Sequence, residues 1–119
     1  MSTQAKICRS KCVGATPRKD SRVGREVAAA ADRAGMLRSR KGRVQFRDPV
    51  DWEWYDLEWA DMCHKHDCVT YWNTEGRWYG YKAPQVRQWM LDPDNYYLGH
   101  RHYNRSAGAR LRTKYLPAA

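Results

Sequence analysis

The chain has 119 residues and carries 22 Lys and Arg against 13 Asp and Glu, which gives a formal net charge of +9. This length is that of one domain at most. No apolar run reaches the roughly 18 residues that a transmembrane helix needs, so we expect no membrane span. Motifs for phosphate-binding loops, dinucleotide sites, serine hydrolases and zinc proteases are absent from the sequence, so we expect no enzyme.

The apolar residues are unusual in kind. There are six Trp and eight Tyr but one Phe, and hydrophobic residues make up 42% of the chain. Self-contained cores are normally built from aliphatic side chains that interdigitate, whereas aromatics with a polar tip are enriched at interfaces. We therefore predict a mainly α-helical, partly globular subunit with extended irregular segments and one short aromatic hairpin. Partner chains would complete its core.

Charge is segregated along the chain. Residues 1–47 carry a net +10, residues 48–70 a net −6 and residues 71–119 a net +5. The pattern predicts a basic extended arm over 1–20, a helical and aromatic body over 21–94, and a basic aromatic tail over 95–119. The Arg-rich, acid-poor first 47 residues also have the composition of a transit peptide.

Two helices have local start signals. Asp20 or Ser21 can cap a helix over about 22–37, whose Val and Ala residues share one face. Pro84 sits where a first helical residue is expected and opens a helix over about 84–91.

The acidic centre predicts a third helix over about 48–66. Asp48 can cap it and Pro49 suits its first position. At about 100° per residue, one continuous stripe forms. Its members are Trp52, Tyr55, Trp59, Met62, Cys63 and His66. Val50, Trp54 and Leu57 form a second stripe, so this helix is expected to be sandwiched between neighbours.

After this helix, two β-favouring runs flank the Asn73–Gly76 turn and predict a hairpin over 69–81. The tail from Asn95 is predicted to be mostly irregular. The aromatic side chains and one methionine are expected to contact partner proteins. They are Trp52, Trp54, Tyr55, Trp59, Met62, Trp72, Trp78 and Trp89.

Four cysteines and four histidines allow a structural zinc site. Cys8 and Cys12 could be one ligand pair. On a continuous helix Cys63 and Cys68 would point about 140° apart, so the second pair is expected to be Cys63 with His66, or His64 with Cys68. His100-x-His102 is a further pair with usable spacing. One or two disulfides and free buried thiols are the alternatives, and the last of these needs no cofactor.

Basic residues in the first third and in the tail could contact RNA phosphates or an acidic partner, with Tyr and His beside them to stack on bases. They are Arg38, Arg40, Lys41, Arg43, Arg101, Arg105, Arg110, Arg112 and Lys114.

The sequence thus favours an accessory, non-catalytic subunit of a large multiprotein assembly. The preferred setting is a mitochondrial respiratory-chain complex, with the chain soluble or peripheral to the inner membrane and adhering to several larger subunits. The alternatives are an organellar ribosomal protein that binds rRNA and a small zinc-stabilised binding module.

Overall fold

The structure is a computed structural model that describes residues 6–111 and 113–119. Of these residues 43% are helical and 20% are in strands, which form antiparallel sheets of three and two strands. The prediction of a mainly helical chain with extended irregular segments is therefore wrong. The reasons lie in particular segments, described below.

The described residues divide into two compact units, each built from segments that are distant in sequence. The helical unit comprises the described parts of Met1–Thr16, His66–Leu91 and Thr113–Ala119. The sheet unit comprises Pro17–Lys65 and the described part of Asp92–Arg112.

The sheet unit begins with helix α2 (Arg22–Arg33), which confirms the helix predicted over 22–37. The hydroxyl of Ser21 accepts the N–H of Gly24 at 3.1 Å and caps it as expected. The helix ends four residues early because Gly35 has a φ of 74°, a left-handed conformation that suits glycine. Strand β1 then follows directly.

Three strands form the first sheet in the order β1 (Leu37–Arg40), β2 (Arg43–Arg47) and β3 (Trp54–Asp56). β1 and β2 are joined by a two-residue turn in which both Lys41 and Gly42 have positive φ, the geometry of a tight hairpin. Phe46 on β2 is fully buried, so one face of this sheet covers the core.

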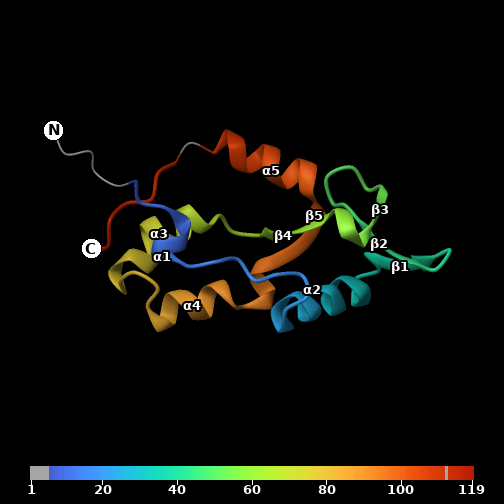
Figure 1. Cartoon of the computed structure of the whole chain (residues 1–119), viewed down its shortest axis with the longest axis horizontal. Coiled ribbons are helices and arrows are strands. Elements are labelled where there is room, and N and C mark those ends of the chain that lie inside the picture. Colours follow the sequence, from blue (N-terminus) through green and yellow to red (C-terminus); the bar gives the residue numbers. More distant parts are fainter. Residues whose placement is uncertain (1–5, 112) are drawn as a thin grey trace. The chain divides into compact units, whose positions relative to one another are not determined.

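The second sheet pairs β4 (Ala60–His64) with β5 (Tyr96–His100), and helix α5 (Arg101–Arg110) packs against both strands (Figure 1). The short helices η1 (Leu57–Trp59) and η3 (Pro93–Asn95) precede the two strands. The core of the sheet unit is one cluster of buried side chains from α2 and both sheets. It consists of Val23, Val27, Phe46, Ala60, Met62, Tyr96 and Leu98.

The helix predicted over 48–66 is wrong: this stretch contains a turn, β3, η1 and β4. The Asp48 carboxylate accepts the Val50 backbone N–H at 2.7 Å, but this hydrogen bond closes a turn and does not begin a helix. Trp52 has a φ of 61°, which a helix cannot include. The aromatic residues beyond it favour strands, and β5 supplies the partner that β4 needs.

The helical unit contains α1 (Arg9–Cys12), α3 (Cys68–Thr74), η2 (Gly76–Trp78) and α4 (Pro84–Met90). α4 confirms the helix predicted over 84–91, with Pro84 at its start. The core of the unit is lined by six buried residues from these helices and the segment after α1. They are Cys12, Val13, Cys68, Trp72, Val86 and Met90.

The hairpin predicted over 69–81 is also wrong, because α3 and η2 occupy this stretch. The Asp67 carboxylate accepts the Thr70 N–H at 3.1 Å and caps α3. As a helix, the segment places Trp72 entirely in the core, where its indole N–H donates to the Leu116 carbonyl at 2.6 Å.

Both chain ends also differ from their predicted form. Within the arm expected to be extended over 1–20, α1 forms and Cys12 and Val13 are fully buried. The tail expected to be irregular contains β5 and α5. Within the described ranges, no helix is long and apolar enough to cross a membrane.

Candidate nucleic-acid interface

Strand register places four arginines on the outer face of the three-stranded sheet. Arg38 lies opposite Gln45, Arg40 opposite Arg43, and Arg47 opposite Trp54. Directly opposed residues project to the same side of a sheet, and the buried Phe46 projects to the other. We call Arg38, Arg40, Arg43, Arg47 and Trp54 the arginine face.

Guanidinium and indole groups are stacked along this face. The Arg38 guanidinium lies 4.3 Å from the centre of the Trp54 ring, and that of Arg47 lies 5.8 Å from it. Arg47 also lies 5.1 Å from the ring of Trp52, whose side chain is 55% exposed. These are cation–π distances, so arginines and tryptophans alternate in one surface row.

Hydrogen bonds hold two of these arginines in place. Nε of Arg38 donates to the Gln45 side-chain oxygen at 2.8 Å, and Nε of Arg47 donates to the Trp52 carbonyl at 2.7 Å. Each guanidinium has five N–H donors in a planar fork. Both side chains therefore keep in-plane donors for a ligand while their orientation is already fixed.

The face is strongly positive in spite of one acid. Asp56 accepts from Arg43 at 2.9 Å and from Gln45 at 3.2 Å, and these hydrogen bonds lower its pKa below the usual range. Desolvation, followed by repulsion from Arg40 and Arg47, lowers the pKa of Arg38 from its ordinary value. An anionic ligand would reduce the repulsion among Arg38, Arg40 and Arg47, which is the smaller of these two contributions.

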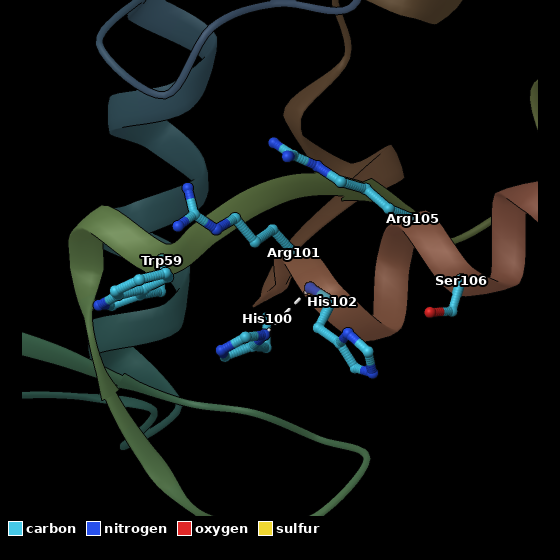
Figure 2. Close-up of a pocket in the computed structure, with 6 residues that line it drawn as sticks. All are labelled: Trp59, His100, Arg101, His102, Arg105 and Ser106. Carbon is cyan, nitrogen blue, oxygen red and sulfur yellow. Dashed lines mark hydrogen bonds between the residues drawn. The ribbon is translucent and has the colours of Figure 1, made fainter.

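A second cationic cluster lies at the junction of β5 and α5. A shallow, open cavity of about 640 Å³ is lined by residues from η1, the end of β5 and the first turns of α5 (Figure 2). We call it the His100 cavity. Its lining residues are Trp59, His100, Arg101, His102, Arg105 and Ser106.

The rings around the His100 cavity are ordered by mutual contacts. The Arg101 guanidinium lies 4.0 Å from the centre of the Trp59 ring (Figure 2). The rings of Trp59 and His100 are parallel to within 6°, with their centres 6.3 Å apart. Nδ1 of His100 accepts the backbone N–H of His102 at 3.0 Å, which fixes the orientation of the imidazole.

Two carboxylates, one buried and one partly buried, hold residues at this cavity in place. Asp48 is 1% exposed, and its Oδ2 accepts the His100 backbone N–H at 2.6 Å. Asp61 accepts two hydrogen bonds from Arg105, both at 3.1 Å, and one from Asn104 at 3.1 Å. Burial alone would raise the pKa of Asp61, but the hydrogen bonds from Arg105 and Asn104 hold it below its ordinary value.

The zinc ligands proposed from the sequence are divided between the two units. Cys8, Cys12 and the exposed His66 belong to the helical unit, and Cys63 belongs to the sheet unit. Among the residues that the structure describes, no group of three or more His, Cys, Asp or Glu side chains could hold a metal ion. All four cysteines lie in the described ranges and none forms a disulfide there, with Cys8 exposed and the others buried.

The aromatic residues expected at partner interfaces fall into different environments. Trp72 and Met62 are core residues, and Trp89 stacks on Tyr71 with ring centres 4.0 Å apart. Tyr55 lies between Phe46 and His100. The exposed members are Trp52, Trp59 and Trp78, and the first two belong to the cationic surfaces of the sheet unit.

The basic residues expected to contact RNA are also distributed. Arg38, Arg40, Lys41 and Arg43 lie on or beside the arginine face, and Arg101 and Arg105 line the His100 cavity. Arg110 is exposed at the end of α5, Lys114 is exposed in the helical unit, and Arg112 lies outside the described residues.

Two features of the site were not predicted from the sequence: the place of Arg47 on the arginine face, and the contact between the rings of Trp59 and His100. The alternation Arg43-x-Gln45-x-Arg47 was a readable signal for the first, since alternate strand residues share a face. The second depends on the pairing of β4 with β5, for which the sequence has no local signal.

Comparison with known protein families, with curated proteins and with solved structures finds no match to this chain.

Proposed function

We propose that this protein binds nucleic acid through the arginine face of the sheet unit. The observation that carries the proposal is the row of arginines stacked on Trp54 and Trp52, on the sheet face turned away from the core. Arginines neutralise backbone phosphates, and exposed aromatic rings stack on bases. A net charge of +9 adds long-range attraction.

The stacked geometry favours nucleic acid over other anionic partners. A guanidinium that lies flat on an indole presents its N–H groups sideways, where a phosphate can accept two of them. The neighbouring indole then offers a flat surface to the adjoining base. An acidic protein or an anionic lipid surface would use the charge but not this alternation of charge and ring.

Equilibrium binding to labelled oligonucleotides of about 20 nucleotides tests the proposal, at salt concentrations of about 50 to 200 mM. The probes are single-stranded RNA, single-stranded DNA and the duplex of each. We expect the logarithm of the affinity to fall linearly with the logarithm of the salt concentration. Combined substitution of Arg38→Gln, Arg40→Gln and Arg43→Gln should weaken binding and reduce that slope by about 2 to 3.

A matched control carries the same charge change elsewhere in the sheet unit. Arg22→Gln, Arg25→Gln and Arg33→Gln remove three charges from α2, and all three side chains are exposed. We expect a much smaller loss of affinity for this variant. Equal losses for the two variants would show that net charge alone causes binding. Binding to anionic vesicles but to none of the oligonucleotides would also overturn the proposal.

A second proposal, that the chain is an accessory, non-catalytic subunit of a large assembly, is favoured by the surface of the helical unit. Trp78 is 63% exposed there, and Tyr79, Tyr81 and Leu91 are exposed as well. Exposed aromatics are enriched at protein interfaces and supply much of their binding energy. The proposed setting is a mitochondrial respiratory-chain complex.

Native purification from the source separates the two proposals. Co-migration with a membrane complex supports the subunit, whereas co-migration with rRNA supports nucleic-acid binding in the form of an organellar ribosomal protein. Migration as a free monomer through every step would contradict the subunit proposal.

A further inference from the structure

The His100 cavity has a lining of donors and cations. Arg101 and Arg105 contribute guanidinium groups, Ser106 a hydroxyl and His102 an exposed imidazole. The six residues that line the cavity include no Asp or Glu. Its volume of about 640 Å³ lies within the range of small-molecule sites. The lining therefore suits an anionic group of limited size.

Two guanidinium groups of the lining keep donors available. Among the described residues, no hydrogen bond involves the guanidinium of Arg101, whose contact is the cation–π stack on Trp59. Arg105 uses Nε and Nη2 on the Asp61 carboxylate, so Nη1 remains. The side chain of Asp61 is only 20% exposed, and its two hydrogen bonds fix the plane of the Arg105 guanidinium. The orientation of Arg105 is thus fixed by its hydrogen bonds to Asp61, and Arg101 is held by its stack on the Trp59 ring.

A flat aromatic surface adjoins these donors. Trp59 is 41% exposed, and its ring runs parallel to the His100 imidazole. The His100 ring is itself fixed by contact with Tyr55, with ring centres 4.5 Å apart. Aromatic platforms of this kind stack on unpaired bases, which every single strand offers and a duplex keeps within its own stack.

We infer that the His100 cavity binds one phosphate of a single-stranded nucleic acid, with the adjoining base stacked on Trp59, and so gives the protein a preference for single strands over duplexes. Arg101 and Arg105 contact the phosphate, and His102 and Ser106 complete its hydrogen bonds. The inference rests on the proposed function and assigns its strand selectivity to a surface separate from the arginine face.

The test compares single-stranded and duplex probes of the same sequence on the full chain. Arg101→Gln and Trp59→Leu each alter the cavity, while Arg33→Gln on α2 is the matched control for lost charge. We expect wild-type protein to favour the single strand, and each cavity variant to weaken single-strand binding by about tenfold. Duplex binding should change less than about threefold, since phosphate contacts on the arginine face remain.

A second measurement uses mononucleotides on the combined Arg38→Gln, Arg40→Gln and Arg43→Gln variant, so that the cavity is probed with the arginine face weakened. Adenosine 5′-monophosphate should quench the tryptophan emission of this variant more strongly than adenosine or inorganic phosphate. Adding Arg101→Gln should remove that difference. His102→Ala, an exposed position, repeats the test should Trp59→Leu lower the thermal stability.

The outcomes separate the two levels of the proposal. If no probe binds, nucleic-acid binding itself fails. If the arginine-face variant loses affinity while both cavity variants bind single strands as wild type does, nucleic-acid binding stands and the cavity assignment is wrong. Equal losses of single-strand and duplex affinity in the cavity variants would likewise overturn the inferred selectivity.

Discussion

The indole of Trp72 is fully buried in the helical unit, whereas that of Trp52 in the sheet unit is 55% exposed and lies against the Arg47 guanidinium. Trp72 donates its N–H to the Leu116 carbonyl and packs among Cys68, Val86 and Met90. The same type of side chain, tryptophan, therefore completes a core in one unit and forms part of a cationic surface in the other.

This contrast corrects a simple interpretation of composition. A chain with six Trp, eight Tyr and one Phe suggests a core finished by partners, yet each unit has buried clusters of its own. Trp72 and Phe46 fill these clusters, and the exposed tryptophans are those beside arginines. Aromatic content alone does not separate packing from binding; the neighbours of each ring do.

The largest expected effect is on Trp72. Trp72→Ala should lower the free energy of unfolding by about 3–5 kcal/mol, because it leaves a cavity and an unpaired Leu116 carbonyl. Trp78→Ala, at a position 63% exposed, should change it by less than about 0.5 kcal/mol. Urea denaturation followed by circular dichroism measures both. Similar losses for the two variants would contradict the division into core and surface tryptophans.

The next effect concerns Asp48, which supports the surface of the sheet unit from inside. Its carboxylate accepts the N–H groups of Val50 and His100, and the side chain is 1% exposed. Asp48→Ala leaves both donors unpaired and should lower stability by about 2 kcal/mol. Asp48→Asn keeps one acceptor oxygen, so its stability should lie between those of wild type and Asp48→Ala. Equal stability of Asp48→Ala and Asp48→Asn would contradict a stabilising role for the hydrogen bonds from Val50 and His100.

Sequence reasoning succeeded where the signals were local. Ser21 caps the start of α2 and Pro84 opens α4, because caps act within one turn of the chain, whereas the end of α2 at Gly35 was missed. It failed over 48–66, where Asp48, Pro49 and a helical stripe imitated a helix. The competing structure depends on pairing β4 with β5, whose residues are far apart in sequence.

The candidate site was predictable in part for the same reason. Net charge and the cluster of Arg38, Arg40 and Arg43 indicated an anionic partner, and the Lys41-Gly42 turn was available as a hairpin signal. Which side chains share a face follows only from the register of β1, β2 and β3. The His100 cavity needs the long-range β4–β5 pair, so its histidines were first considered as zinc ligands.

A smaller effect should appear in acid at Asp61. Its folded pKa lies below the ordinary value because Arg105 and Asn104 donate to the carboxylate. The associated stability is present above the unfolded pKa of about 3.9 and is lost as pH falls through the folded pKa. Because Arg105 is exposed to solvent, this contribution to stability is less than about 1 kcal/mol. Unfolding free energy measured against pH should fall less steeply below about pH 5 in Asp61→Asn. If the decrease in unfolding free energy at acid pH is the same in Asp61→Asn and wild type, the Asp61–Arg105 pair adds no stability.

The smallest expected change in stability is on the arginine face. It tests most directly the contrast between residues that serve binding and residues, such as Trp72, that serve the fold. Arg40 lies directly opposite Arg43 at the exposed end of the β1–β2 hairpin, and like charges in opposed positions repel. Arg40→Gln should therefore alter the free energy of unfolding by less than about 0.5 kcal/mol, with stabilisation the expected sign. The same substitution should weaken oligonucleotide binding and lower the salt slope by about 1. Denaturation and binding measured on one preparation would show whether this surface serves binding while Trp72 serves the fold. A marked loss of stability without loss of affinity would reverse that assignment.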